Sequence, residues 1–269
     1  MWEKFIHKFL KVPYRLSVHN FNSPKHPAAT IILIHGIGTS WKTWQDVAEK
    51  IPSNIRVIAV DLLGFGDSPK PSWQTYNAKI QADCIATTLL SKGLAGPVYI
   101  YGHSLGSLVA VELAKRYPIM VKALVLCSPP FYKLPKDSGI FNQERRLRRY
   151  FKMATNNPNI SSKLLRIASD LKLWPDAGYI IKDNIGAKAF LKTLDAAIIN
   201  QTSLKDVTLL KQPIYILCGS LDPFVVKSNL QYISDNCDNV TYIKIPKIRH
   251  EINKRYVDEI IKITNKLFD

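Results

Sequence analysis

Short runs of β-forming residues alternate with longer helical patterns along the chain from residue 30 onward. These runs are nearly continuous in Val, Ile, Leu and Tyr, without regular polar positions. Strands of this composition are typical of parallel sheets that helices cover on both faces. The runs span residues 30–34, 56–61, 98–101, 123–126, 214–218 and 240–245. We therefore expect an α/β fold with a mostly parallel sheet, to which residues 14–18 add an edge strand.

Amphipathic patterns between these runs predict the helices that cover the sheet. Residues 77–92 place apolar side chains on one side and are followed by Gly93. Residues 104–117 stop at Pro118, and residues 251–267 space their apolar side chains at helical intervals. Glycine and proline commonly follow the last helical turn. Each pattern therefore predicts one helix.

The rhythm changes after the fourth of the β-forming runs. Between residues 129 and 204 strand-like runs disappear, and amphipathic basic segments at 143–154 and 161–173 replace them. The insertion leaves the sheet at the carboxyl end of a strand, which is the edge where open parallel sheets carry their active sites. We therefore expect residues 129–204 to form a helical cap on a core domain made of residues 1–128 and 205–269.

The composition indicates a globular protein with a strongly basic surface. Hydrophobic residues make up 46% of the 269 residues, and the formal net charge is +16. A field of this sign attracts anionic partners such as nucleic acids, membrane surfaces or acidic substrates. Neither a zinc-finger pattern nor an RNA-binding aromatic signature is present, so we expect no specific nucleic-acid binding. The oligomeric state stays unknown at this stage.

Cysteine usage and hydropathy favour a cytoplasmic protein. The four cysteines are far apart, and Cys84, Cys127 and Cys218 fall within or beside apolar runs, as buried free thiols do. Neither zinc nor redox spacing is present, so we expect no metal and no cofactor. No stretch of eighteen residues is apolar and uncharged, and the first ten residues lack the features of a signal peptide.

The first eleven residues have an amphipathic helical pattern. Three lysines, at positions 4, 8 and 11, lie off the apolar face. Packing of that face against the protein's own surface is the favoured interpretation, and peripheral contact with an anionic membrane is the alternative. In the second case lipid-like esters become attractive substrates. The apolar face carries Trp2, Phe5, Ile6, Phe9 and Leu10.

The sharpest motif is Tyr-Gly-His-Ser-Leu-Gly at residues 101–106. It lies directly between a predicted strand and a predicted helix. A nucleophile on such a sharp turn needs small neighbours on both sides, so that the chains pack closely and the hydroxyl stays accessible. The motif therefore predicts Ser104 as a nucleophile.

A serine hydroxyl is a weak nucleophile unless a base, most often histidine, removes its proton. In a strand-turn-helix arrangement the base comes last in chain order, and only His250 of the six histidines meets this condition. The base in turn needs a carboxylate that holds its tautomer. Asp222 follows a predicted strand at the required edge, whereas Asp235 and Asp238 lie at the opposite edge. Ser128 occupies another suitable position but is not acidic, so Asp222 is the predicted acid.

Attack on a carbonyl group places negative charge on its oxygen, which backbone N–H groups stabilise. Leu105 begins the helix after the nucleophile and supplies one donor, aided by the helix dipole. The second donor is expected from the glycine-containing turn after the first core strand, and we assign it to the Ile37 N–H.

These motifs together resemble the α/β-hydrolase superfamily. The resemblance extends from about residue 14 to the end of the sequence, and it points to the capped branch that includes carboxylesterases, carbon-carbon bond hydrolases, dehalogenases and epoxide hydrolases. The last two use aspartate as nucleophile, from which Ser104 departs. The resemblance implies hydrolysis through an acyl-enzyme without naming the ester. It rests on residues 35–38 (HGIG), 61–68 (DLLGFGDS), 102–106 (GHSLG), 219–222 (GSLD) and His250.

The leading hypothesis is a serine hydrolase that cleaves a carboxylic ester with an apolar acyl group. A thioesterase or a carbon-carbon bond hydrolase is the alternative within the same chemistry. Outside catalysis, the fold also suits a ligand receptor or a membrane-surface interaction protein. We expect the substrate pocket to be lined by Gly36, His103, Phe131 and Phe224.

Overall fold

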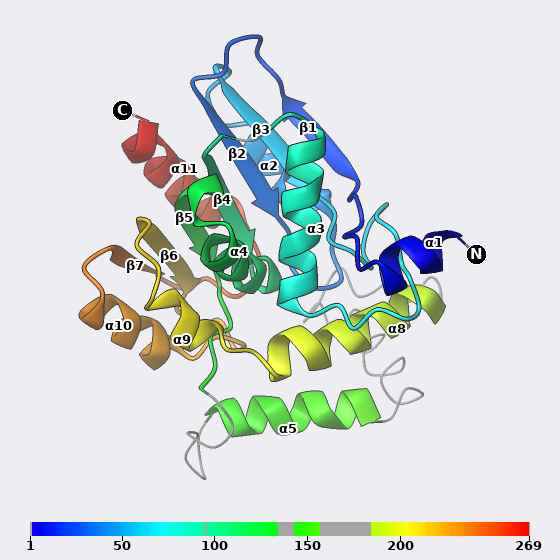
Figure 1. Cartoon of the computed structure of the whole chain (residues 1–269). Coiled ribbons are helices and arrows are strands. Elements are labelled where there is room, and N and C mark those ends of the chain that lie inside the picture. Colours follow the sequence, from blue (N-terminus) through cyan, green and yellow to red (C-terminus); the bar gives the residue numbers. More distant parts are fainter. Residues whose placement is uncertain (1, 95, 134–142, 157–183, 269) are drawn as a thin grey trace.

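A seven-stranded sheet runs through the computed structural model, which describes residues 2–94, 96–133, 143–156 and 184–268 (Figure 1). In space the strand order is β1-β3-β2-β4-β5-β6-β7; β1 is antiparallel to β3, and all other neighbours are parallel. The predicted mostly parallel α/β sheet is thus confirmed. The strands are β1 (Val18–Asn22), β2 (Ala29–Ile34), β3 (Ile55–Val60), β4 (Val98–His103), β5 (Val121–Cys127), β6 (Ile214–Gly219) and β7 (Val240–Ile245).

Helices lie on both sides of this sheet (Figure 1). In chain order the α-helices are α1 (Trp2–Lys4), α2 (Gln45–Ala48), α3 (Ala78–Ser91), α4 (Leu105–Arg116), α5 (Gln143–Asn156), α8 (Asn184–Thr193), α9 (Ser203–Val207), α10 (Lys227–Asn236) and α11 (Lys254–Phe268). Shorter helical segments are the π-helices η1 (Phe5–Phe9) and η5 (Leu194–Ile199) and the 3-10 helices η2 (Trp41–Trp44) and η3 (Pro118–Met120).

The burial of β2 explains why these strands are nearly continuous in apolar residues. Ile31, Ile32, Leu33 and Ile34 are all fully buried. Ile32 and Ile34 pack in one cluster with side chains of α3 and α4, whereas Ile31 and Leu33 pack in another with side chains of α2 and α11. Because alternate side chains of a strand point to opposite faces, a strand covered on both sides has no place for a solvated residue.

The helices predicted at residues 77–92, 104–117 and 251–267 form as α3, α4 and α11, which follow β3, β4 and β7. Asn77 caps α3 by accepting the Ile80 N–H at 2.9 Å, and Gly93 follows the helix with φ +72°. These are the start and stop signals that the sequence contains. Helix α11 begins later than its apolar pattern does, because Asn253 Oδ1 accepts the Tyr256 N–H at 3.2 Å and starts the helix there.

An edge strand forms, but the predicted bounds of 14–18 are wrong. The edge strand β1 begins at Val18, where the pattern ends. Tyr14 and Leu16 are buried, as their apolar character predicts, but the N–H groups of Leu16 and Ser17 donate to side chains. The Leu16 N–H donates to Thr88 Oγ1 and the Ser17 N–H to Ser68 Oγ, each at 2.9 Å. The apolar residues alone could not show whether this buried segment pairs with a neighbouring strand.

Helices α5 and α8 lie beyond the carboxyl ends of the central strands, with α8 between α5 and the sheet (Figure 1). The amphipathic pattern at 143–154 is confirmed as α5. The pattern at 161–173 lies outside the described residues. The division into a core domain and a cap at residues 129–204 stays a prediction.

Helix α4 approaches β2 unusually closely at Gly106. A Cβ atom at this position would lie 2.2 Å from the Ile34 carbonyl oxygen, so no side chain fits without moving the helix or the strand. We expect Gly106→Ala to destabilise the fold by about 2 kcal/mol or more, measured as a lower urea midpoint. Gly96→Ala is the control, because a Cβ there meets nothing within 4 Å. Equal midpoints for the two variants would contradict the close approach.

Candidate active site

Ser104 occupies the sharp turn between β4 and α4. Its backbone has φ 52° and ψ −116°, a conformation that residues with a side chain rarely adopt. The Ser104 N–H donates to the Cys127 carbonyl of β5 at 2.8 Å, which anchors the turn to the neighbouring strand. A Cβ at Gly102 would lie 2.5 Å from the Gly106 carbonyl oxygen. Both glycines of the motif are therefore needed for the turn that positions the serine.

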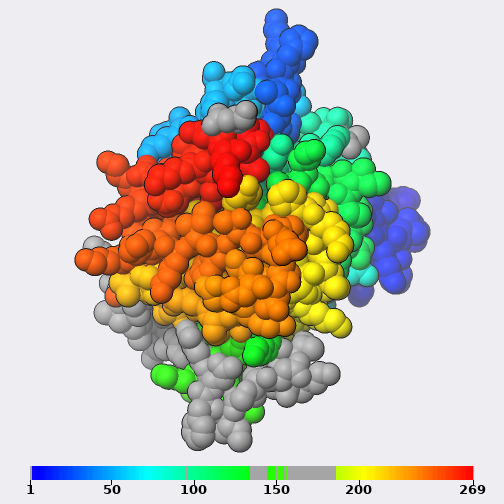
Figure 2. Space-filling view, turned by 90° about the vertical axis from the view of Figure 1, so that its left-hand side faces the viewer, coloured from blue at the N-terminus to red at the C-terminus, as the bar shows by residue number. Residues whose placement is uncertain are grey.

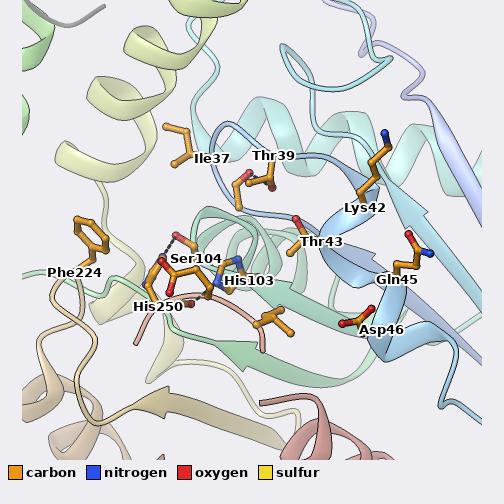
Figure 3. Close-up of a pocket in the computed structure, with 13 residues that line it drawn as sticks. Ile37, Thr39, Lys42, Thr43, Gln45, Asp46, His103, Ser104, Phe224 and His250 are labelled. Atoms are coloured by element: carbon orange, nitrogen blue, oxygen red, sulfur yellow. Dashed lines mark hydrogen bonds between the residues drawn. The ribbon is translucent and has the colours of Figure 1, made fainter. Parts of the chain in front are cut away.

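Three side chains from three loops meet at this turn, and Figure 3 shows two of them, Ser104 and His250. His250 Nε2 lies 3.0 Å from Ser104 Oγ, and His250 Nδ1 lies 2.7 Å from Asp222 Oδ2. A carboxylate only accepts hydrogen bonds, so the proton between His250 and Asp222 belongs to Nδ1 and leaves Nε2 free to accept the serine O–H. Ser104, His250 and Asp222, predicted separately from the sequence, thus form one hydrogen-bonded line.

Asp222 is only 1% exposed and is held in its charged form. Burial alone raises the pKa of this carboxyl, but His250, the Phe224 N–H and the Ser128 hydroxyl together lower the pKa below its ordinary value. The Phe224 N–H donates to Oδ1 at 2.9 Å, so both carboxylate oxygens have partners. The acid that faces His250 is therefore both fixed in place and ionised.

Ser128, which sequence reasoning noted only as a non-acidic position, belongs to the surroundings of Asp222. Its backbone φ is +50°, and its N–H donates to the Leu217 carbonyl at 2.7 Å. The Tyr256 hydroxyl donates to the same carbonyl at 2.7 Å and lies 3.2 Å from Ser128 Oγ. A buried polar cluster thus supports the carboxylate from behind. Its only sequence signal was the place of Ser128 after a strand.

His103 lines the site as predicted, and it also holds the loop that carries His250. Its Nε2 lies 2.9 Å from the His250 carbonyl oxygen, which can only accept a hydrogen bond, so Nε2 carries a proton. Burial, followed by the nearby His250, lowers the pKa of His103 to about 3. His103 is therefore a neutral donor across the physiological pH range.

The turn after β2 is fixed by His35. This ring is fully buried, its Nδ1–H donates to the Gly36 carbonyl at 2.7 Å, and its Nε2 accepts the Leu62 N–H at 2.9 Å. Thr39 Oγ1 also donates to the Gly36 carbonyl, at 3.1 Å. The C=O and N–H of one trans peptide point in opposite directions, so holding the Gly36 carbonyl also fixes the direction of the Ile37 N–H.

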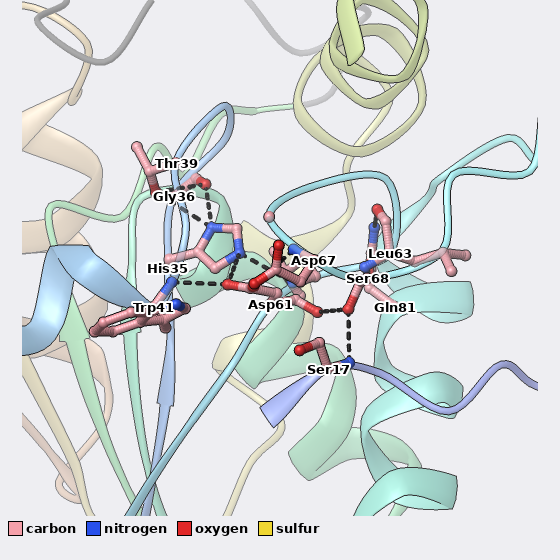
Figure 4. A network of polar contacts seen from close by, with 12 residues as sticks. Ser17, His35, Gly36, Thr39, Trp41, Asp61, Leu63, Asp67, Ser68 and Gln81 are labelled. Atoms are coloured by element: carbon pink, nitrogen blue, oxygen red, sulfur yellow. Dashed lines mark hydrogen bonds and ion pairs between the residues drawn. The ribbon is translucent and has the colours of Figure 1, made fainter. Parts of the chain in front are cut away.

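Asp61 ties this turn to the loop after β3 (Figure 4). Its Oδ1 accepts the Trp41 N–H at 2.8 Å and its Oδ2 accepts the Asp67 N–H at 2.9 Å. A Cβ at Gly66 would lie 2.1 Å from the same carboxylate, and the Gly66 φ is +51°. The run 61–68 is thus a structural support for the turn beside Ser104.

Two cavities meet at Ser104. The larger, of about 270 Å³, is an open cleft with a polar wall (Figure 3). The smaller, of about 20 Å³, is a mainly apolar slot beneath α5 and η5. Both share Ile37, Ser104, Phe224 and His250. The cleft adds Gly36, Thr39, Lys42, Thr43, Gln45, Asp46, His103, Glu251 and Ile252, and the slot adds Pro130, Tyr132, Phe151, Leu194 and Ile198.

Of the four predicted pocket residues, Gly36, His103 and Phe224 line the cleft. The prediction for Phe131 is wrong: among the described residues it lines neither cavity, and its side chain is fully buried in the core cluster. Its neighbour Tyr132 faces the slot instead. Sequence reasoning did not single out Leu194 and Ile198. Their spacing of four residues, which places two side chains on one helical face, was the available signal.

Comparison with known sequences identifies the family to which this fold belongs. A family model of the α/β-hydrolase fold matches residues 29–159. A pimeloyl-[acyl-carrier protein] methyl ester esterase from Pseudoalteromonas atlantica is 30% identical over 205 residues, which cover 72% of this chain and 76% of that protein. The chain belongs to the α/β-hydrolase family.

Other relatives of this α/β hydrolase match over shorter stretches. Probable lysophospholipase BODYGUARD 2 from Arabidopsis thaliana is 38% identical over 111 residues, or 39% of this chain. The matches span only 22–36% of the length of the five BODYGUARD proteins.

Solved structures superpose over nearly the whole chain. A thermophilic esterase from Thermogutta terrifontis superposes with a TM-score of 0.73 at 19% identity, over 94% of both chains. An enol-lactonase from Burkholderia xenovorans gives 0.73 at 16% identity, over 94% and 96% of the two chains. These two likenesses concern the fold.

Within the described part of this hydrolase, no three His, Cys, Asp or Glu side chains gather as a metal site would require. None of the described helices is both long and apolar enough to cross a bilayer.

Buried neutral histidines make the stability of the fold depend on pH. Burial lowers the pKa values of His35 and His103, so below about pH 6.5 the unfolded chain binds protons that the folded chain does not. The stabilisation is complete above this pH and is lost as the pH falls toward the folded-state values, by about 1.4 kcal/mol per unit and per histidine. Urea unfolding between about pH 7 and pH 5 should therefore show falling stability.

His103→Gln should reduce this pH dependence by up to one proton, because one of the two buried rings is gone. The exposed His26→Gln is the matched control. A slope for His103→Gln equal to that of the wild type would contradict the assignment of His103 as a buried neutral ring.

Proposed function

We propose that this α/β hydrolase cleaves a carboxylic ester with an apolar acyl group through an acyl-enzyme on Ser104. The single observation that carries the proposal is the line from Ser104 Oγ through His250 to Asp222, with distances of 3.0 and 2.7 Å, at the junction of two cavities. A hydroxyl, an imidazole and a buried carboxylate in this order are the elements of nucleophilic catalysis by serine.

In the proposed reaction, Ser104 Oγ attacks the ester carbonyl while His250 Nε2 takes the hydroxyl proton. The resulting oxyanion accepts hydrogen bonds from the Ile37 and Leu105 N–H groups. Both donors are available for this role, because neither donates a hydrogen bond to another described residue. His250 then passes its proton to the departing alcohol. Water, activated by the same histidine, attacks the acyl-enzyme and releases the acid. Asp222 keeps the histidine oriented and stabilises its charged form.

The two cavities suggest where the two halves of the ester bind. The slot is lined mainly by apolar and aromatic side chains such as Phe151, Leu194 and Ile198, which suits the acyl group. The cleft has a polar wall with Lys42 and Asp46, which suits the alcohol half. Relatives named as a methyl ester esterase and as probable lysophospholipases support ester chemistry.

A fluorophosphonate probe tests the nucleophile directly. We expect one covalent adduct on the folded protein, located at Ser104 by mass spectrometry and absent from Ser104→Ala. Asp222→Asn should keep the fold but lower kcat for a p-nitrophenyl ester by about 10³- to 10⁴-fold, because the histidine loses its preferred tautomer. No adduct on the wild-type protein would favour a ligand receptor on the same fold.

The size of the slot predicts the acyl preference. A space of about 20 Å³ admits a short acyl group, and Phe151→Ala should enlarge it. We expect hydrolysis of p-nitrophenyl esters to peak at short chains in the wild type and to shift to longer chains in Phe151→Ala. Leu191→Ala, on the neighbouring helix and outside the lining, is the control. If Phe151→Ala leaves the chain-length profile unchanged, the acyl group does not bind in the slot. If matched thioesters or diketones are hydrolysed faster than the oxygen esters, the proposed substrate class is wrong.

A further inference from the structure

The N-terminal segment turns its apolar side chains away from the protein. None of the residues of α1 and η1 is buried. Trp2 is 77% exposed, Phe9 70% and Leu10 59%, and Phe5, Ile6 and Val12 are also exposed. Figure 2 shows this segment in dark blue, standing out from one side of the molecule. The favoured expectation, that this face packs against the protein's own surface, is therefore wrong.

The polar side chains of the same segment hold it to the body of the protein. The Tyr14 hydroxyl donates to Glu3 at 3.2 Å, and the His7 ring stacks on the Tyr14 ring with centroids 3.7 Å apart. The Lys4 ammonium lies 5.6 Å from the Trp73 ring centroid. Ordinary amphipathic surface helices bury their apolar face and expose their polar face. This segment is attached the other way round.

An exposed cluster of large apolar side chains marks a surface that another phase or molecule covers. Trp and Phe beside lysines are typical of helices that lie in the interface of a lipid bilayer. Lys8 and Lys11 are exposed beside the apolar face, and the whole chain carries a formal net charge of +16. Anionic headgroups complement this charge, whereas a second copy would bring two sets of lysines together.

We propose that residues 2–12 dock this protein on an anionic lipid surface, with Trp2, Phe5 and Phe9 inserted between the headgroups. The contact of this segment with Trp73 lies close to α8, because Lys192 of α8 donates to the carbonyls of Ser72 and Gln74 on either side of Trp73. The inference does not rest on the proposed esterase activity, since its test measures binding.

Vesicle flotation tests the proposal. The wild-type protein should float with vesicles of phosphatidylcholine and phosphatidylglycerol, and more weakly with phosphatidylcholine alone. The double variant Phe5→Ser, Phe9→Ser should bind the anionic vesicles about tenfold or more weakly. The control is Ile119→Ser, which removes an apolar side chain that is 86% exposed on η3. Circular dichroism and thermal unfolding confirm that each variant is folded.

A second measurement reports insertion itself. Brominated lipids should quench part of the tryptophan fluorescence of the wild type, and this part should disappear in Trp2→Phe. Lys8→Glu should weaken binding to anionic vesicles without changing the oligomeric state. Three results would each overturn the proposal: no flotation of the wild type, equal flotation of the Phe5→Ser, Phe9→Ser variant, or a dimer in sedimentation that this variant dissociates, which would assign the apolar face to a second copy.

Discussion

The left-handed backbone conformation of Ser104 is the constraint on which the site depends. It exists because β4 enters α4 without a connecting loop, which requires the glycines on either side and the hydrogen bond from the Ser104 N–H to Cys127. The same turn places the hydroxyl outside the helix and directs the first N–H of α4 toward the carboxyl edge of the sheet. Loops after β6 and β7 then need only reach that edge to complete the line to His250 and Asp222.

Buried polar side chains hold the backbone around this turn by hydrogen bonds. His35 and His103 are both neutral rings that hold backbone carbonyls, one in the turn of Ile37 and the other in the loop of His250. Asp61 and Asp222 are both buried carboxylates, but Asp61 accepts backbone N–H groups, whereas Asp222 faces an imidazole. Histidine and aspartate thus serve both as structural supports and in the proposed chemistry. The position of each residue relative to Ser104 decides which role it has.

Much of this arrangement could be predicted from local patterns, because parallel strands, helix caps and the glycine-flanked serine each leave a signature within a few residues. Ser104, Asp222 and His250 could be placed at one edge of the sheet because each follows the carboxyl end of a predicted parallel strand. Features made by distant contacts had no such signature: the Leu16 N–H donates to a side chain, Phe131 turns into the core while Tyr132 faces the slot, and the apolar face of η1 stays exposed. Each depends on which surface a side chain meets after folding, and hydropathy alone does not encode that.

The central claim is that the peptide groups of Ile37 and Leu105 are already aimed at the oxygen that becomes negative when Ser104 attacks. A crystal structure of the fluorophosphonate-treated protein tests it most directly, because the tetrahedral phosphorus imitates the intermediate. The account predicts a bond from Ser104 Oγ to phosphorus and a phosphoryl oxygen about 3 Å from both backbone nitrogens. A phosphoryl oxygen directed away from both nitrogens, or an adduct on another residue, would contradict it.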